Sequence, residues 1–391
     1  MKKDNKDFVI KTSLDRATEV ADSYGFITIE TPGVSKDAEK KCKGICNVPD
    51  ESRCTEKATL ISLYSNEWSG LSRPMSIIYD LPFKKSGKRK PPKTNFYGLD
   101  IIGANGAIAE ATLIQTAKAI LEEAGYKKLV FEINSIGERE ALSRFEKELT
   151  AYFRKNISSL SPDEQKLFKD NVFELLKTNK VSKTLKKLIE DAPQSISFLS
   201  EPGRVHLKNV LEYLEELNID YVMNCHLIES RDYSSHTSFA IKSNKGKILA
   251  IGSRYGSLVR KIGLRKDIPA VGIRLSYKDI KPSVRKKKVT KKNFYFVQVG
   301  PEAKLKSLEV IEMLRKKKIS TYHSLMRDKI SSQLSTAENL KLPYVVIMGK
   351  KEAHERTIAV RENITRSQKN IPLDDLPDYI KKLEKNLSKK K

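Results

Sequence analysis

One stretch decides the fold of this chain: Gly252-Ser253-Arg254-Tyr255-Gly256-Ser257-Leu258, followed after a short gap by Pro269-Ala270-Val271-Gly272-Ile273. Apolar residues before it predict a strand over residues 247–252, and two earlier strands are predicted over residues 221–227 and 238–241. The quoted stretch therefore lies in a part of the chain that forms a β-sheet.

Length and composition describe an ordinary soluble protein. The chain has 391 residues, of which 39% are hydrophobic and 31% charged, which predicts two or three domains with a proper core. No apolar run approaches the roughly 18 residues of a membrane span. Residues 1–7 mix acids with lysines and are not typical of a signal or transit peptide. We expect a cytoplasmic protein.

The net charge of +25 is concentrated at one end of the chain. Residues 281–391 carry 28 Lys and Arg against 12 Asp and Glu, a local excess of 16 positive charges. Lysine-rich usage can reflect genome composition alone. Its uneven distribution favours a polyanionic partner such as RNA.

Three of the four cysteines, Cys42, Cys46 and Cys54, form a C-x3-C-x7-C cluster, and Cys225 lies far away. No fourth Cys or His stands nearby to complete a tetrahedral zinc site. We therefore expect reduced thiols and no metal.

Helices and strands alternate along the first 280 residues. The predicted order is helix and strand over 14–32, helix 58–64, strand 75–80, a basic loop 84–93, strand 95–103, helix 107–124, strand 129–134 and a charged helical region over 138–220.

A basic segment, residues 281–292, then reads as a linker because it has a proline, many cations and little to bury. Beyond it the pattern is βαβα, which predicts a small α/β domain with a mostly parallel sheet. Its predicted strands are 294–299, 319–322, 344–348 and 357–361, and its predicted helices are 302–317, 330–340 and 373–387.

This order of elements resembles that of histidyl-tRNA synthetases, a family of class II aminoacyl-tRNA synthetases. The opening stretch is similar to the family's G-G-R-Y-D-x-L and P-A-V-G-F, and three more segments support the likeness: residues 131–137, the run that begins at Asn171, and the C-terminal stretches 329–337 and 345–352. Residues 14–32 resemble motif 1, the element through which class II synthetases dimerise.

The resemblance implies an α/β (α+β) protein. It places a class II antiparallel sheet core at residues 1–280 with a helical insertion at about 140–220, a basic linker at 281–292, and an α/β anticodon-binding domain at 293–391. It further implies a homodimer that binds tRNA or another structured RNA, with no membrane association.

The resemblance also places three arginines around the triphosphate of ATP. Here those positions fall on Lys84, Glu229 and Asp279. A carboxylate repels a polyphosphate where a guanidinium would clamp it. Arg231, two residues after Glu229, is a candidate replacement, so Lys84 and Arg231 are the candidate catalytic cations.

Other family positions imply a substrate pocket. Glu56 and Asp100 keep the acidic positions of the family's R-P-E-G-T and H-Q-F-G-V-E, whereas Phe96 replaces the glutamine. His236 stands where the family has glycine and is a candidate to fill part of the pocket. The predicted substrate-binding residues are Glu56, Asp100, Tyr233, Arg254 and Tyr255.

Candidate RNA contacts come from the basic loop, the linker and the C-terminal domain. They are Lys84, Lys85, Lys88, Arg89, Lys90, Lys286, Lys287, Lys288, Lys329 and Gln333.

Three functional hypotheses remain open. The first is a non-catalytic, tRNA-binding paralogue with a degraded aminoacylation site. The second is a divergent but working histidine–tRNA ligase, which would need ATP and Mg²⁺. The third is a regulatory subunit of a histidine-biosynthesis enzyme, although the family's paralogues of that kind lack the C-terminal domain.

Overall fold

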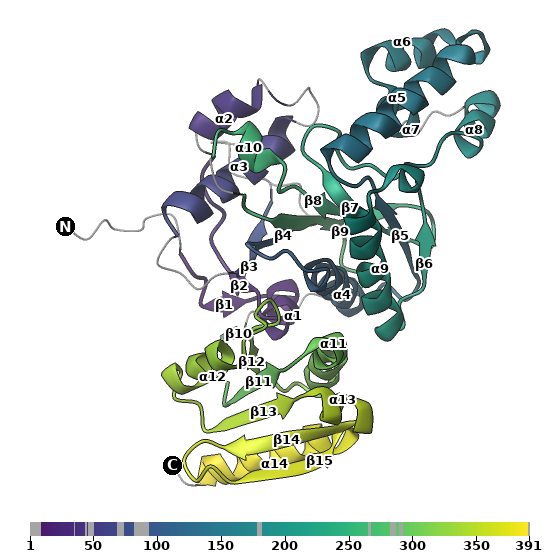
Figure 1. The fold of residues 1–391 in the computed structure, drawn as a ribbon. Coiled ribbons are helices and arrows are strands. Elements are labelled where there is room, and N and C mark those ends of the chain that lie inside the picture. Colours follow the sequence, from purple (N-terminus) through teal and green to yellow (C-terminus); the bar gives the residue numbers. More distant parts are fainter. Residues whose placement is uncertain are drawn as a thin grey trace.

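A computed structural model describes residues 9–34, 36–43, 45, 51–68, 74–81, 94–177, 182–264, 267–281, 287–288 and 292–389. All structural statements below concern these residues. They form a sheet-based core, a helical insertion at the upper right of Figure 1, and a C-terminal domain at its bottom. Within them, no helix is both long and apolar enough to cross a membrane.

The core is one eight-stranded sheet in the order β2-β3-β4-β9-β8-β7-β5-β6. Its inner pairings from β3 to β5 are antiparallel, and only the pairs β2–β3 and β5–β6 at the two edges are parallel. This confirms the predicted antiparallel core. The strands are β2 Ile27–Thr28, β3 Met75–Asp80, β4 Asn95–Ile102, β5 Leu129–Ser135, β6 Tyr221–Met223, β7 Ser235–Ser243, β8 Ile248–Arg254 and β9 Ala270–Tyr277.

Strand alternation divides the sheet into two faces, which we call the α4 face and the α3 face. On β4, Leu99 and Ile101 pack in the same apolar cluster as helix α4 (Ile108–Glu123). On β3, the side chains of Ile77 and Tyr79 pack with helix α3 (Glu51–Asn66) on the opposite face. Because successive side chains of a strand point to opposite sides, each strand serves both layers.

Shorter helices complete the two layers. Helix α1 (Arg16–Ser23) packs with α4, while α2 (Lys36–Lys43) and α10 (Leu258–Lys261) pack with α3. Asp15 caps α1 by accepting a hydrogen bond from the backbone N–H of Thr18.

The insertion has an apolar cluster of its own, which includes Phe145, Phe153 and Phe173. Its last helix, α9, runs beside α4 and connects the insertion to the core. The insertion helices are α5 Arg139–Lys155, α6 Pro162–Asp170, α7 Val172–Lys177, α8 Lys183–Glu190 and α9 Glu201–Glu216.

The C-terminal sheet has the order β12-β11-β13-β14-β15. The pairings of β11 are parallel, whereas β13–β14 and β14–β15 are antiparallel. The prediction of a mostly parallel sheet was wrong, because β14 pairs antiparallel with β13 and because the prediction missed β15, a polar strand that returns along β14. The elements are β11 Phe294–Gln298, α11 Pro301–Lys316, β12 Tyr322–His323, α12 Ile330–Asn339, β13 Tyr344–Met348, α13 Lys350–Glu355, β14 Thr357–Glu362, β15 Gln368–Pro372 and α14 Leu376–Lys389.

The predicted linker is structured where it is described. Strand β10 (Lys287–Lys288) pairs antiparallel with β1 (Ser13–Leu14). The buried side chain of Lys292 forms an ion pair with Asp22 of α1, with an Nζ–Oδ2 distance of 2.9 Å. Lys292, and Lys287 through its contact with Glu19, therefore neutralise acids on the core, a long-range pairing that local composition does not reveal.

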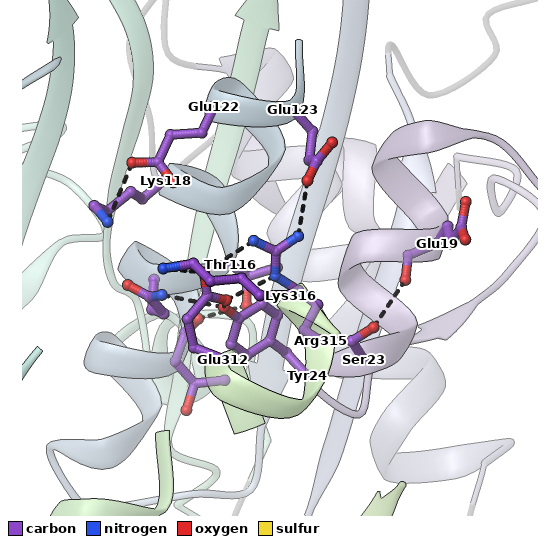
Figure 2. A network of polar contacts seen from close by, with 12 residues as sticks. Glu19, Ser23, Tyr24, Thr116, Lys118, Glu122, Glu123, Glu312, Arg315 and Lys316 are labelled. Carbon is purple, nitrogen blue, oxygen red and sulfur yellow. Dashed lines mark hydrogen bonds and ion pairs between the residues drawn. The ribbon is translucent and has the colours of Figure 1, made fainter. Parts of the chain in front are cut away.

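A buried polar network holds the C-terminal domain on the core (Figure 2). Tyr24, after α1, donates a hydrogen bond to Glu312 of α11, and Gln115 of α4 donates to the Tyr24 oxygen at 3.1 Å. Arg315 contacts both Glu312 at 2.7 Å and Glu123 at 3.1 Å. The interface thus joins α1, α4 and α11 by charged, directional contacts.

Candidate functional site

The candidate site is a buried polar cluster around Asp100 on the α3 face of the sheet. Asp100 is fully buried and accepts hydrogen bonds from the hydroxyls of Tyr79 and Tyr255, both at 2.7 Å. The Nζ atom of Lys57, from α3, lies 2.7 Å from Asp100 Oδ1 and 4.8 Å from the centroid of the Tyr255 ring. The side chain of Lys57 is only 2% exposed. A cation, two hydroxyls and a carboxylate thus satisfy one another away from water.

Glu56 extends this cluster toward β9. Its carboxyl lies 2.9 Å from the Tyr79 hydroxyl and 3.5 Å from the guanidinium of Arg274. Tyr79 has a single proton to donate, and two carboxyl groups are within its reach. Burial raises the pKa of Glu56, which favours a protonated carboxyl. A protonated Glu56 can donate to the Tyr79 oxygen while Tyr79 donates to Asp100, so that all three groups are paired.

The side chains of the cluster pack directly against the backbone of the sheet at Gly98 and Gly272. A Cβ atom added to Gly272 would lie 2.0 Å from Asp100 Oδ1 and 2.5 Å from Lys57 Nζ. One added to Gly98 would lie 2.4 Å from the Tyr79 ring. The space above these two strands is therefore filled by the protein's own side chains.

Glu229 anchors a second buried group beside the first. It accepts hydrogen bonds from Ser253 Oγ at 2.7 Å and from the Tyr233 hydroxyl at 3.2 Å. Arg53 of α3 lies 3.7 Å away. Glu229 stands where the family resemblance places an arginine that binds the triphosphate. This chain has a buried carboxylate there, and Arg53, Ser253 and Tyr233 balance its charge.

Arg231 does not join either group. Its guanidinium is bidentate to Glu146 of α5, at 2.7 and 3.1 Å, and 44% of its side chain is exposed. The suggestion that Arg231 replaces the missing arginine at Glu229 is therefore not supported, because its side chain is committed to the insertion.

Arg254, predicted to bind substrate together with Tyr255, does not join the Asp100 cluster. Arg254 points to the α4 face, where it forms a bidentate pair with Glu110 at 2.5 and 2.7 Å. Glu110 also contacts His206 at 2.7 Å. Burial alone would raise the pKa of Glu110. Arg254 and His206 outweigh this effect and lower the pKa to about 2. Adjacent strand residues point to opposite faces, so the sequence itself argued against assigning both residues to one pocket.

A cavity of about 860 Å³ lies between the insertion and the ends of β7, β8 and β9. Arg139, Arg231, Arg254, Lys261 and His236 are among the residues that line it, whereas Asp100 and Glu56 are not. His236 was a candidate to fill the substrate pocket. The structure places it in the lining of this cavity, outside the Asp100 cluster, with a left-handed backbone (φ 51°) and a pKa that burial lowers.

The remaining predicted positions are more scattered. Asp279 follows β9 and accepts hydrogen bonds from Arg16 at 3.0 Å and Asn95 at 2.8 Å. Several basic residues lie outside the described part of the chain and keep their status as predictions: Lys84, Lys85, Lys88, Arg89, Lys90 and Lys286.

Of the predicted RNA contacts in the described ranges, Gln333 is excluded by its burial. Its amide bonds both the N–H and the carbonyl of Gln298, which ties α12 to β11. Lys329 is exposed at the start of α12, and Lys287 and Lys288 are exposed on β10, where Lys287 contacts Glu19 at 2.8 Å. Lys288 and Lys329 are therefore exposed to a polyanion, whereas Lys287 already pairs with Glu19.

Sequence reasoning predicted Glu56 but missed Arg53, Lys57, Tyr79 and Arg274, which complete the two buried groups. Arg53, Glu56 and Lys57 are spaced i, i+3 and i+4, so they share one side of a helix. Tyr79 on β3 and Arg274 on β9 lie at strand positions whose side chains point to the α3 face, as the two-residue repeat of a strand requires. This spacing was visible in the sequence, but the partners across the fold were not. Across the described ranges, no cluster of His, Cys, Asp and Glu is arranged to hold a metal ion.

Comparison with known proteins agrees with this architecture. Residues 293–383 match the anticodon binding domain family. A histidine–tRNA ligase from Vesicomyosocius okutanii is 27% identical over 390 residues, covering 92% of this chain and 91% of the relative. One from Geobacillus sp. (strain WCH70) is 30% identical over 295 residues, covering 73% of this chain and 69% of the relative.

Among solved structures, apo S. aureus histidyl-tRNA synthetase shares 21% identity and 93% coverage of both chains, with a TM-score of 0.48. The extended match to the Geobacillus enzyme, together with the anticodon-binding domain, establishes descent. The chain belongs to the histidyl-tRNA synthetase family.

Proposed function

We propose that this chain is a tRNA-binding member of its family that no longer activates histidine. The observation that carries the proposal is the buried ion pair between Lys57 and Asp100. An amino acid bound at this point would need a carboxylate for its α-ammonium group. Lys57 already supplies an ammonium group there, so the chain's own side chain occupies the charge-pairing position.

The electrostatics beside the cluster also disfavour ATP. Activation of an amino acid by ATP depends strongly on stabilising the charge that develops on the leaving pyrophosphate. Loss of one hydrogen-bond donor to such a charge commonly costs about 10²–10³ in rate. Here Glu229 brings a buried negative charge to a predicted phosphate-binding position. Arg53, Ser253 and Tyr233 satisfy that charge, so Arg53 is already paired within the chain. The described residues of this region do not fit a triphosphate with Mg²⁺.

RNA binding is supported by different features. The matched anticodon-binding domain lies in the part of the chain with the largest positive excess. Lys288 and Lys329 are exposed there and have room for phosphate contacts. Phosphate neutralisation dominates such affinities and makes them sensitive to salt.

Two assays on the purified protein test the proposal together. We expect no histidine-dependent exchange between ATP and pyrophosphate, and tRNA binding whose affinity falls linearly on a log–log plot against salt. Each neutralised phosphate contributes a slope of roughly −0.7 to −0.9. Formation of histidyl-tRNA by the purified protein would contradict the proposal and establish a working ligase.

A variant pair locates the RNA contact. Lys329→Ala should weaken tRNA binding uniformly across sequences and reduce the salt slope by about 1. The matched control is Lys208→Ala, which removes another exposed lysine that pairs with Glu212 on α9, outside the C-terminal domain. Equal effects of both variants would show that binding follows net charge and not the C-terminal domain.

Self-association is part of the same proposal. The predicted dimer element comprises α1 and β2, and one side of α1 is already covered by α4 and α11 within the chain. A homodimer formed through this element would therefore use the remaining surface around β2 and α1. Sedimentation equilibrium over a concentration series measures this directly, and a constant monomer mass would rule it out.

A further inference from the structure

Cys42 and Cys54 lie close together inside the layer on the α3 face. Cys42 is in the last turn of α2, Cys54 is in the first turn of α3, and both are fully buried. Their Sγ atoms are 2.9 Å apart. Two sulfur atoms in ordinary van der Waals contact lie farther apart than this, and a disulfide bond is about 2.05 Å long. We propose that these two thiols are a site of reversible disulfide formation.

The surrounding packing already holds the two sulfurs together. Cys42 and Cys54 belong to one apolar cluster, with Ala38 on α2 and Ala58 on α3 among its members. Helices α2 and α3 make many backbone contacts with each other. Closing the remaining gap of less than 1 Å requires a small side-chain adjustment, and both helices can stay in place. Strain of the kind that weakens disulfides between distant cysteines is therefore small here.

The positions of the two thiols in their helices determine which cysteine reacts first. The positive end of the α3 dipole stabilises a thiolate at Cys54. Cys42 sits at the negative end of α2, which has the opposite effect. Cys54 is therefore the nucleophile when the layer opens to a small-molecule disulfide such as oxidised glutathione.

The exchange is balanced in two steps. Cys54 thiolate attacks one glutathione sulfur, which forms a mixed disulfide and releases one glutathione thiolate. Cys42 then attacks Cys54 Sγ and displaces the second glutathione. The protein loses two thiol protons and two electrons, and the oxidant becomes two glutathione molecules.

The bond would act on the candidate site through α3. The same helix carries Arg53, Glu56 and Lys57, which close the two buried polar clusters. A covalent link to α2 restrains the start of α3 and so stabilises the closed arrangement. The inference itself depends on the sulfur geometry and stands whether or not the chain binds tRNA.

Peptide mapping of the full-length protein tests this. After incubation with oxidised glutathione, denaturation and alkylation with N-ethylmaleimide, we expect two of the four cysteines to be alkylated and a cross-linked peptide that contains Cys42 and Cys54. Alkylation of all four, a stable glutathione adduct on one cysteine, or a link through Cys46 or Cys225 would overturn the proposal.

Variants add a second readout. Cys54→Ala should abolish the cross-link, whereas Cys225→Ala, which removes a cysteine buried elsewhere, should keep it. In the wild-type protein, oxidation should raise Tm by about 5 °C. The same treatment should leave the Tm of Cys54→Ala unchanged. If that variant does not fold, the wild-type peptide map alone decides the question.

Discussion

At the scale of single residues, Lys57 determines what the site can do. Its ammonium group lies between Asp100 and the ring of Tyr255 and is almost entirely shielded from water. A charge in the protein interior is tolerated only where a partner of opposite sign compensates for its lost hydration. The pair therefore acts as one unit, and the loss of either member affects the other.

We expect Lys57→Met to destabilise the protein by about 3–5 kcal/mol, because it leaves the buried Asp100 carboxylate without a cation. The double variant Lys57→Met with Asp100→Asn should recover most of this loss. Urea unfolding followed by circular dichroism measures both. Lys208→Met, which breaks an exposed pair with Glu212, is the matched control and should cost under about 1 kcal/mol. Additive losses in the double variant would show that the pair is not coupled.

At the scale of elements, the spacing between α3 and the sheet depends on two glycines. Gly98 on β4 and Gly272 on β9 allow Tyr79, Asp100 and Lys57 to lie against the backbone. Any side chain there would push the polar cluster away from the strands. Glycine in a strand interior is otherwise unfavourable. The close approach of these side chains to the backbone therefore explains why glycine occupies positions 98 and 272.

Gly272→Ala should destabilise the protein by about 1–3 kcal/mol, in the range of overpacked cores. The new methyl group would displace the Asp100 carboxylate or the Lys57 ammonium group and break their ion pair. Gly33→Ala is the matched control, because nothing lies within 4 Å of an added Cβ there. Thermal unfolding of the two variants checks this, and equal Tm values would contradict the described packing.

At the scale of the whole molecule, the docking of the C-terminal domain involves a titratable contact. His323 of β12 lies against Gly25, where an added Cβ would be 2.8 Å from its ring, and its Nε2 is 3.1 Å from the Ser23 carbonyl. Burial and the nearby Lys292 together lower the pKa of His323 to about 4, although the hydrogen bond to the Ser23 carbonyl opposes this shift. The neutral ring is thus part of the interface.

Because its pKa is lower in the folded than in the unfolded protein, His323 stabilises the fold fully above about pH 6.5. That contribution is lost as pH falls from 6.5 through 4, where the unfolded chain binds the extra proton. The full loss is about 3 kcal/mol. A His323→Asn variant should lack this share of the acid sensitivity in Tm measured between pH 7 and 4. An identical pH profile in the variant would refute the assignment.

The sequence predicted the elements well and the contacts poorly. Strands β3 and β4 and helix α4 follow from hydrophobic periodicity, which is a local property of the chain. Strand β15 was missed because its residues are mostly exposed and polar, so they carry no such signal. Gln333 was misassigned because its polarity suggested a surface position, whereas its amide satisfies the backbone of Gln298.

The motifs and the order of predicted elements were enough to identify the family and to list the residues at each position of the site. What those residues do depends on contacts that form only when the chain folds. Lys57 pairs with Asp100, Glu229 is buried beside Arg53, and Arg254 points away from Tyr255 to the opposite face. The reason is physical: periodicity depends on neighbours within a few residues, whereas the pairing of buried charges depends on which distant elements the packing brings into contact.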